Sequence, residues 1–287
     1  MSNLQFFNPQ VTGDGSFTFF SPEFEETFHS HGGAKQEAEL KFIEPCLIRS
    51  KAQQQDRIRI LDVCYGLGYN SAAALTGIGE VNPHCRVELV ALELNPRVAQ
   101  AALAHHLLDL WPAEVVEGLG QLVAVGSCQR GNLEARMLWG DARQSIKGVL
   151  DDGFRADAIF LDPFSPPKCP QLWTVEFLGA VAQALAPTGR LATYSCAAAV
   201  RGALMEAGLR IGASPRVGRR SPGTVASWAG DLPPLSLQEQ EHLLTRAAVP
   251  YRDRTGQDSP TIIRQRRQAE QTSSPLEPSS HWKKRWT

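Results

Sequence analysis

Five apolar segments alternate with five helix-like segments between residues 58 and 207, and this alternation constrains the fold more than any other feature of the sequence. The expected strands are 58–64, 86–92, 135–138, 156–161 and 190–194. The expected helices are 71–78, 96–110, 142–150, 173–185 and 197–207. Apolar strands separated by helices are typical of a parallel sheet covered on both faces. We therefore expect a Rossmann-like α/β fold whose strands end along one edge of the sheet.

The flanking segments are expected to add to this core. Residues 1–33 are rich in turn formers and predict a short hairpin or arm laid over the domain. Residues 34–48 have helical spacing with Pro45 late in the run, so we expect a helix that fades before a polar connector at 53–56.

At the C-terminal side, 209–213 and 224–230 are expected to pair as a hairpin, and 237–247 to form an amphipathic helix. The sheet is then mostly parallel and seven-stranded. We divide the chain into an N-terminal arm and helix (1–55), a central domain (56–232) and a C-terminal helix with a basic extension (233–287).

Charge is distributed unevenly along a nearly neutral chain of 287 residues with net charge −1. From 246 to 287, nine Lys or Arg oppose four acidic residues, and five arginines with one glutamate occupy 201–220. A basic tail on a neutral protein indicates an RNA partner, although a solvated and partly disordered tail is the alternative. Trp282 and Trp286 favour docking of the tail against either the protein body or RNA bases.

The cysteines and the N-terminus indicate the cellular compartment and whether a metal is expected. Six scattered cysteines form no Cys-x-x-Cys pair, which argues against zinc and is typical of reduced thiols. We find no signal region and no apolar run near the roughly 20 residues of a membrane span. We expect a cytoplasmic protein with no metal and no membrane partner. His29 and His31 could be ligands or a substrate latch, but histidines in a surface turn usually have neither role.

The turn after the first expected strand carries Gly66 and Gly68 and is followed by a helix of small residues. Glycines let the backbone approach a ligand closely, and the helix N-terminus offers free amide donors. Such turns serve nicotinamide, flavin and S-adenosylmethionine alike, so the turn by itself does not select a cofactor.

Glu93, Asp141 and Asp162 lie at or just after the ends of later strands, at the same edge of the expected sheet. Glu93 is placed to accept hydrogen bonds from ribose hydroxyls, or to stabilise the helix that begins near Pro96. Asp141 can accept the exocyclic amine of adenine, or cap the helix that begins near Ala142. At Asp141 both roles are compatible.

Asp162 begins a proline-stiffened run, DPFSPPK, that ends at Lys168. A carboxylate at a strand end beside Pro163 and Phe164 can hold an amino group while the aromatic ring stacks on a planar base. A rigid loop with a capping aspartate is the plain structural alternative. Arg219 and Arg220 could contact phosphate, and ordinary solvation explains them equally well.

Taken in order, these motifs resemble the methyltransferase domain of the MnmC family, bifunctional proteins that modify the wobble uridine of tRNA. The resemblance covers roughly 56–228 and rests on LDVCYGLGYN (61–70), GDA (140–142), DAIFLDPFSP (157–166), PQLWT (170–174) and GRLATYS (189–195). A generic methyltransferase would share only the first glycines. Cys64 stands where the family usually has glycine, and we expect it only to tighten the turn.

The resemblance implies a class I S-adenosyl-L-methionine-dependent N-methyltransferase acting on the 5-aminomethyl group of wobble (2-thio)uridine in the tRNA anticodon loop. It implies Asp162 as the catalytic residue. It also implies cofactor contacts by Asp62, Tyr65, Gly66, Gly68, Asn70, Glu93, Asp141 and Ala142, and substrate contacts by Pro163, Phe164, Lys168, Arg219 and Arg220. We see no flavin-dependent oxidase domain in the 287 residues, so we expect a stand-alone form that needs an upstream enzyme to supply the aminomethyl uridine.

Other functions stay open. The same site could methylate an amine of a small molecule or a protein, or the chain could be an RNA-binding relative without catalysis. The intact acids Glu93, Asp141 and Asp162 speak against the latter. A nicotinamide dehydrogenase fits least, because no His or Lys proton relay and no second catalytic domain are visible. The choice of tRNA, the 2-thiolation of the uridine and the oligomeric state are not determined by the sequence.

Overall fold

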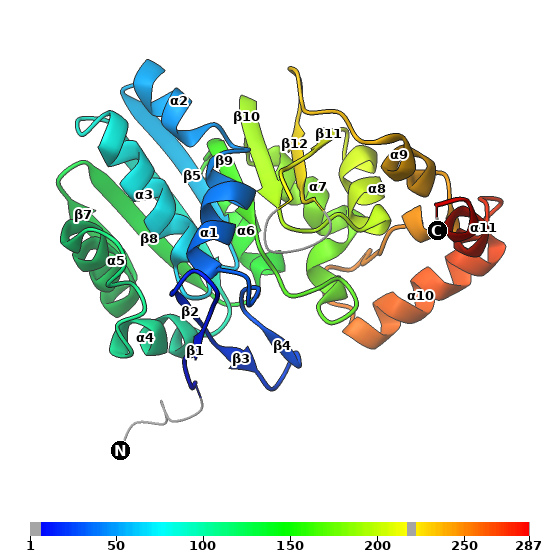
Figure 1. The fold of residues 1–287 in the computed structure, drawn as a ribbon, viewed down its shortest axis with the longest axis horizontal. Coiled ribbons are helices and arrows are strands. Elements are labelled where there is room, and N and C mark those ends of the chain that lie inside the picture. Colours follow the sequence, from blue (N-terminus) through cyan, green and yellow to red (C-terminus); the bar gives the residue numbers. More distant parts are fainter. Residues whose placement is uncertain (1–6, 217–221, 287) are drawn as a thin grey trace.

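A central eight-stranded sheet organises the protein (Figure 1). The computed structural model describes residues 7–216 and 222–286. The strand order is β11-β12-β10-β9-β5-β6-β8-β7. The strands are β5 (Arg57–Val63), β6 (Arg86–Glu93), β7 (Ser127–Arg130), β8 (Leu133–Trp139), β9 (Ala156–Leu161), β10 (Leu185–Thr193), β11 (Arg210–Ala213) and β12 (Thr224–Ser227).

The five central strands are parallel, as expected, and the β11–β12 hairpin is confirmed. The expected count of seven strands is one too low, because β7 pairs antiparallel with β8 at the sheet edge. Only Cys128 of its four residues is buried, so β7 lacks the apolar pattern that marks a strand.

The order of the strands places a crevice at the end of β5. The chain passes from β5 to β6 on one side, and later returns to β9 on the other side of β5. Open α/β sheets bind ligands outside the carboxyl ends of the strands, at the point where the strand order reverses. The strand order therefore predicts a ligand site at the loops after β5 and β9.

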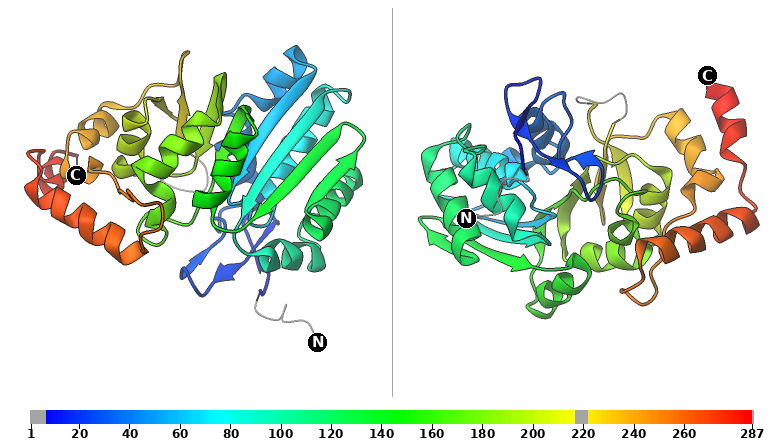
Figure 2. Two further views of the ribbon diagram at one scale, coloured as in Figure 1. Left: turned by 180° about the vertical axis from the view of Figure 1, so that it is seen from behind. Right: turned by 90° about the horizontal axis from the view of Figure 1, so that it is seen from below.

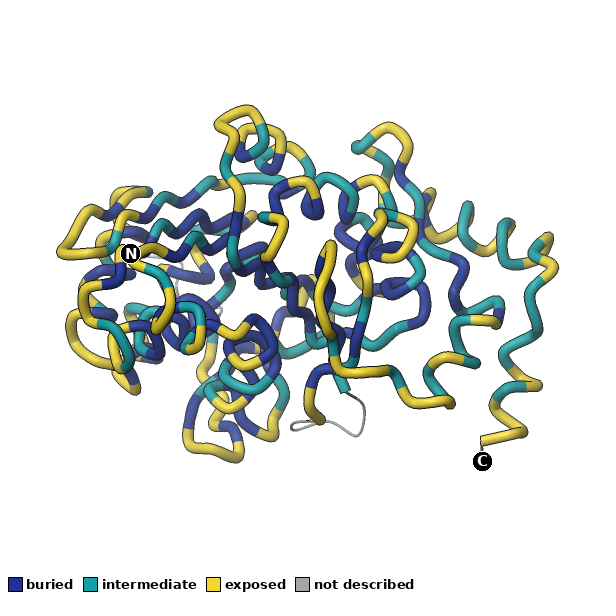
Figure 3. The backbone as a smooth tube through the Cα atoms, turned by 90° about the horizontal axis from the view of Figure 1, so that it is seen from above, coloured by how far each residue is buried: buried dark blue, intermediate teal, exposed yellow. Residues whose placement is uncertain are grey.

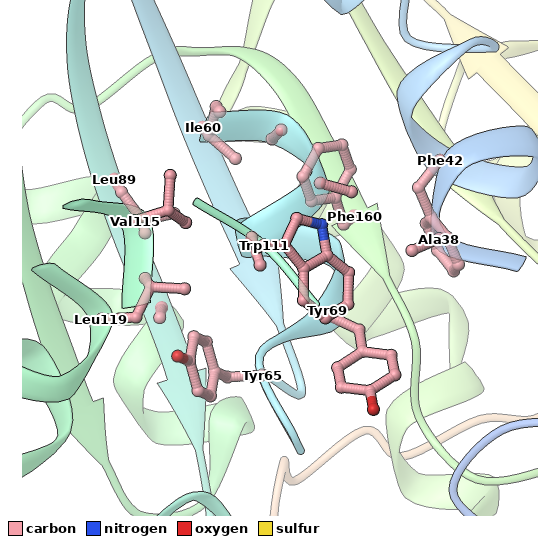
Figure 4. Packing of buried hydrophobic residues seen from close by; sticks show 14 of the residues in the cluster. Ala38, Phe42, Ile60, Tyr65, Tyr69, Leu89, Trp111, Val115, Leu119 and Phe160 are labelled. Atoms are coloured by element: carbon pink, nitrogen blue, oxygen red, sulfur yellow. The ribbon is translucent and has the colours of Figure 1, made fainter. Parts of the chain in front are cut away.

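Helices cover both faces of the sheet, each layer over its own buried apolar cluster (Figures 1 and 3). Ile58 and Ile60 of β5 face the layer of α3 (Tyr69–Val81), α4 (Pro96–Ala104) and α5 (Ala113–Val125). Leu61 and Val63 face the layer of α6 (Ala142–Asp151), α7 (Val175–Gln183) and α8 (Ala198–Glu206). Figure 4 shows Ile60 and Leu89 in the first cluster.

The helix expected at 34–48 is interrupted. The structure has α1 (Ala34–Ala38), a π-helical turn η2 (Glu39–Ile43) and then α2 (Ile48–Gln54), which extends into the expected connector. Pro45 lacks an amide donor, and Leu47 adopts a left-handed φ of +57°. The break at this point separates the two helices.

Two further differences lie between β6 and β8. Helix α4 ends at Ala104 and not at residue 110, since His106 has a φ of +58°. Helix α5 is not marked in the sequence, because Gly118 and Gly120 lower its helical propensity. A β-carbon at Gly118 would stand 3.1 Å from Leu133 Cδ2, so this glycine lets α5 pack closely on β8.

The N-terminal arm consists of two small hairpins, as expected. β1 (Gln10–Val11) pairs with β2 (Phe17–Thr18), and β3 (Phe20–Ser21) pairs with β4 (Glu26–Thr27). Figure 1 shows both hairpins at the lower end of the sheet.

The C-terminal segment is helical and packed, with α9 (Leu237–Leu243), η4 (Arg246–Ala248), α10 (Pro260–Ser273) and α11 (Ser279–Trp286). It lies at the end of the molecule remote from α4 and α5 (Figure 2). Trp282 stacks on His242 at 4.0 Å and donates from Nε1 to the Gln238 carbonyl. Trp286 Nε1 donates to Glu241. Both tryptophans therefore contact α9, within the C-terminal segment.

Candidate active site

A cavity of about 670 Å³ opens at the C-terminal edge of the sheet, facing the N-terminal arm. Its sheet side includes Cys64, Gly66, Glu93, Asn95, Gly140, Asp141, Ala142, Asp162, Pro163 and Phe164. Its arm side includes residues 20–28 and His31. The volume is in the range of small-molecule and cofactor sites.

The turn after β5 brings bare backbone to the cavity. Gly66 has a φ of +57° and donates its N–H to Glu93 Oε2 at 2.8 Å. A β-carbon at Gly66 would stand 3.6 Å from Phe28 Cδ1 on the arm, so a side chain here would project into the space between sheet and arm. Glycine keeps that space available for a ligand.

Cys64 has a left-handed φ of +69° and lines the cavity. The expectation that cysteine only tightens the turn is wrong, because a β-carbon is strained at this φ and glycine is not. Burial, together with the charge of Glu93, raises the pKa of the Cys64 thiol well above its usual value. The side chain is therefore a neutral thiol.

Gly68 and Tyr65 shape the turn from behind. Gly68 has a φ of +86°, and a β-carbon there would stand 2.5 Å from the Tyr65 hydroxyl. The Tyr65 ring is buried in the apolar cluster, beside Leu119 in Figure 4. Neither residue is among those that line the cavity.

Glu93 is 8% exposed at the end of β6 and lines the cavity. Its Oε1 accepts the Asn95 N–H at 2.8 Å, in addition to the bond from Gly66. Burial raises the pKa of Glu93, while these backbone bonds oppose the rise. A carboxylate offers about four acceptor positions, so Glu93 can still accept a ligand hydroxyl.

Asp62 lies behind the same turn and is fully buried outside the cavity lining. Its Oδ2 accepts a hydrogen bond from Ser71 Oγ at 2.6 Å. Burial raises the pKa of Asp62 to about 7, despite the bond from Ser71. In this structure Asp62 contacts the start of α3.

Asp162 follows β9 and reaches the cavity. Asn70 Nδ2 donates to Asp162 Oδ2 at 2.9 Å, and Asn70 itself is buried behind that carboxylate. Tyr194 donates to the Pro163 carbonyl at 2.9 Å, and Trp173 Nε1 to the Phe164 carbonyl at 2.8 Å. The loop that carries Asp162 is thus fixed from several sides.

The arm contributes residues that sequence reasoning missed. Phe24 stacks on Phe164 with centroids 4.3 Å apart and planes at 15°, and Phe28 meets Phe164 edge-on at 4.9 Å. Glu26 accepts hydrogen bonds from the Ser165 amide, at 2.9 Å, and from the Ser165 hydroxyl. The run of phenylalanines and glutamates in 20–28 is the one signal that could have suggested this role.

Asp141 caps α6 and lines the cavity together with Ala142. Its Oδ1 accepts the Arg143 amide at 2.9 Å, and its Oδ2 forms an ion pair with Arg143 Nη2 at 2.7 Å. The capping role expected as an alternative is therefore present. The contact with adenine stays a prediction.

The remaining candidates are dispersed. Lys168 pairs with Glu25 at the surface and is not among the cavity-lining residues. Arg219 and Arg220 lie outside the described residues. His29 is buried and stacks on Tyr69 at 4.9 Å, whereas His31 lines the cavity.

Arg201, one of the five arginines of 201–220, is not accessible to an RNA phosphate. It is 2% exposed, and its Nη2 pairs with Glu239 at 2.8 Å and also donates to the Gly223 carbonyl. This arginine fixes α8 to the segments around 223 and 239.

Residues 7–216 and 222–286 contain no group of three or more His, Cys, Asp or Glu side chains arranged to hold a metal. Within the same described ranges, every helix is too short or too polar to cross a membrane.

The sequence matches a family model described as S-adenosyl-L-methionine-dependent methyltransferase over residues 100–229. In structure the protein is similar to MNMC2 from Aquifex aeolicus, with a TM-score of 0.82 and 36% identity, covering 93% of this chain and 86% of that one. An uncharacterised protein of Methanocaldococcus jannaschii is 31% identical over 85% of this chain and 67% of its own length.

Bifunctional proteins are also similar to this chain. One from Ralstonia nicotianae, named tRNA 5-methylaminomethyl-2-thiouridine biosynthesis bifunctional protein MnmC, is 30% identical over 77% of this chain and 34% of its own length. The chain spans about a third of the length of these bifunctional relatives.

Proposed function

This chain belongs to the family of S-adenosyl-L-methionine-dependent methyltransferases that includes MNMC2 of Aquifex aeolicus, and we propose that it methylates the 5-aminomethyl group of wobble uridine in tRNA. The observation that carries the proposal is Asp162, held by Asn70 at the cavity between the cofactor edge of the sheet and the arm. The names of the bifunctional relatives refer to 5-methylaminomethyl-2-thiouridine, the product of such a transfer.

The charge of the cavity supports a cationic substrate. Its described lining contains no Lys or Arg and seven acidic residues: Glu23, Glu25, Glu26, Glu37, Glu93, Asp141 and Asp162. An excess of carboxylates stabilises positive groups in a partly buried space. An alkylammonium and a sulfonium are both positive, so this lining suits the substrate and the methyl donor together.

The residues at the sheet edge fit S-adenosyl-L-methionine, which when bound supplies a methyl group carried on positively charged sulfur. Glu93 would accept the ribose hydroxyls, and the bare backbone at Gly66 leaves room beside them. Asp141 would accept the adenine amine.

The chain's own chemical task is to prepare the amine. An alkylamine has a pKa of about 10 by analogy with lysine, so it is mostly protonated at neutral pH. Asp162 accepts a hydrogen bond from the amine or takes its proton, and Asn70 fixes the orientation of the carboxylate. The ammonium must lose one proton before it can react, because only the neutral amine has a free lone pair; that lone pair would then accept the methyl group as the carbon–sulfur bond of the donor breaks. The proton then passes to water.

The base would lie against Pro163 and the aromatic group formed by Phe164, Phe24 and Phe28. Since Phe24 covers one face of Phe164, the arm and this loop together form the substrate wall. An anticodon-loop uridine is unpaired, so little energy is needed to present it.

Phosphates would contact the C-terminal segment. Arg254, Arg264 and Lys284 are exposed there and form no ion pair with an acidic residue of the described chain. Arg264 also donates to the Pro167 carbonyl at 3.1 Å, which places it beside the loop of Asp162. These cations would hold the anticodon stem-loop next to the cavity.

We further propose that the protein works in the cytoplasm, where an upstream enzyme supplies the aminomethyl uridine. Transfer of labelled methyl groups to bulk tRNA, measured beside a pool of metabolites and proteins, tests the substrate class. We expect label in tRNA only. Label found only in metabolites or proteins would show that tRNA is not the substrate. Failure to bind S-adenosyl-L-methionine in a calorimetric titration would show that the protein is not a methyltransferase.

A further inference from the structure

Arg143 links the cavity to the C-terminal segment. Its Nε and Nη2 donate to the Asp141 carboxylate, with Nη2 at 2.7 Å from Oδ2. On its other side, Nη1 donates to Asp253 Oδ2 at 2.8 Å and to the Asp258 carbonyl at 3.1 Å. One guanidinium therefore joins the cap of α6 to a loop more than 100 residues later in the chain.

The link is enclosed. The side chain of Asp253 is 1% exposed and that of Arg143 is 14% exposed, whereas that of Asp141 is 37% exposed at the cavity. Charges removed from water lose solvation, which is recovered only by good pairing geometry. Asp253 and Asp141 approach different edges of the planar guanidinium, so its orientation is fixed from both sides.

The Asp253 loop is itself held rigidly. Asp253 Oδ1 accepts the Thr255 hydroxyl and the Asp258 amide, and the Asp253 amide donates to Glu176 Oε2 at 2.7 Å. Arg266 of α10 pairs with Asp258 at 2.7 Å. The anchor for Arg143 is thus built by the C-terminal segment, outside the residues 100–229 matched by the family model.

We propose that Asp253 is a positioning residue that acts through Arg143 to orient the Asp141 carboxylate toward the adenine of the cofactor. The C-terminal segment then completes the cofactor site. This inference rests on the proposed function, because it takes Asp141 as the adenine contact.

A purely structural role for Asp253 predicts a different result. Loss of the anchor would then loosen the loop and weaken all ligands equally. A positioning role affects only the part of the ligand that Asp141 contacts. S-adenosylhomocysteine and its inosine counterpart separate these cases, since the counterpart carries a carbonyl oxygen in place of the adenine amine and cannot donate a hydrogen bond to Asp141 from that position.

The experiment measures the Kd of both ligands by calorimetry for the wild-type protein, Asp253→Asn, Asp141→Asn and the double variant. We expect Asp253→Asn to weaken S-adenosylhomocysteine about tenfold, the effect of one lost charge-assisted hydrogen bond, and the inosine counterpart less than twofold. In the double variant, Asp253→Asn should add less than twofold to the effect of Asp141→Asn. Glu206→Gln breaks an ion pair with Arg252, the residue next to Asp253, without removing a partner of Arg143, and should leave both Kd values within twofold.

Equal weakening of both ligands by Asp253→Asn, or no weakening, overturns the inference while leaving the function intact. If Asp253→Asn fails to fold, Arg143→Lys, which keeps the charge but loses the two-sided geometry, should give the same selective loss. If the losses of affinity caused by Asp253→Asn and Asp141→Asn add up in full in the double variant, the two residues are not coupled, and the inference is also overturned. A wild-type protein that binds neither ligand would refute the proposed function itself.

Discussion

Asn70 Nδ2 donates to Asp162 Oδ2 across 2.9 Å, joining the first turn of α3 to the loop after β9. The two residues are 92 positions apart, and only the parallel pairing of β5 with β9 brings them together. The bond leaves the carboxylate at the cavity while fixing its rotation. It connects the glycine turn with the proposed proton acceptor.

Replacing Asp162 should separate binding from chemistry. Asp162→Ala removes the acceptor for the amine proton, so methyl transfer should fall at least about a hundredfold, within the range for general-base catalysis. Cofactor affinity should stay within a few-fold. Single-turnover transfer and calorimetry measure the two effects, and near-normal turnover would refute the role.

The arm should support the same loop. Glu26→Gln weakens the two hydrogen bonds to Ser165, so we expect kcat to fall about tenfold while the Kd of the methyl donor stays within twofold. Glu80→Gln, which breaks an exposed ion pair with Arg49, is the control and should change neither kcat nor the Kd of the methyl donor. A larger loss in donor affinity than in kcat would place Glu26 on the cofactor side instead.

Gly68, which precedes α3, and Gly79, within it, should respond to substitution in opposite directions. Gly68→Ala introduces a β-carbon at positive φ against the Tyr65 hydroxyl, and should destabilise the fold by about 1–2 kcal/mol or more. A β-carbon at Gly79, inside the helix, would have no atom within 4 Å, so Gly79→Ala should stabilise the fold by about 0.5–1 kcal/mol. Urea unfolding measures both, and equal effects would contradict the local geometry.

Stability should depend on the ionisation of Asp62. Its pKa rises from 3.8 to about 7 on folding, so between these values the folded state holds a proton that the unfolded state has lost. The contribution of Asp62 to the free energy of unfolding therefore falls as pH rises from about 4 to about 7, and is constant above. Asp62→Asn should raise Tm most above pH 7 and less at pH 5. A Tm difference independent of pH would show that the pKa of Asp62 does not rise on folding.

Binding of tRNA should weaken steeply with salt. Arg264→Ala removes one cation beside the cavity and should reduce the slope of log K against log salt by about 0.7–1. Arg155, at the opposite end of β9 from the cavity, provides the control, since Arg155→Ala should leave the slope unchanged. An affinity for tRNA that does not vary with salt would show that these cations do not contact phosphates.

Much of the fold follows from local pattern. The apolar strand at 156–161 and the acid after it could be located because buried parallel strands carry long apolar runs. Strand β7 and helix α5 could not, since the polar residues of the one and the glycines of the other hide elements that tertiary packing stabilises.

The site was only partly accessible to the same reasoning. Strand ends identify Glu93, Asp141 and Asp162, because parallel topology brings them to one edge. The stacking of Phe24 on Phe164 and the link from Arg143 to Asp253 depend on how distant segments fold back, which spacing along the chain does not reveal.

The sharpest test of methyl transfer to wobble uridine is nucleoside mass analysis of tRNA from cells that lack the modification, after incubation with this protein and S-adenosyl-L-methionine. We expect that 5-aminomethyl uridine at the wobble position is converted to its methylamino form, and that Asp162→Ala protein leaves it unchanged. Methylation of a different nucleoside, or persistence of the aminomethyl form with wild-type protein that binds the donor, would contradict it.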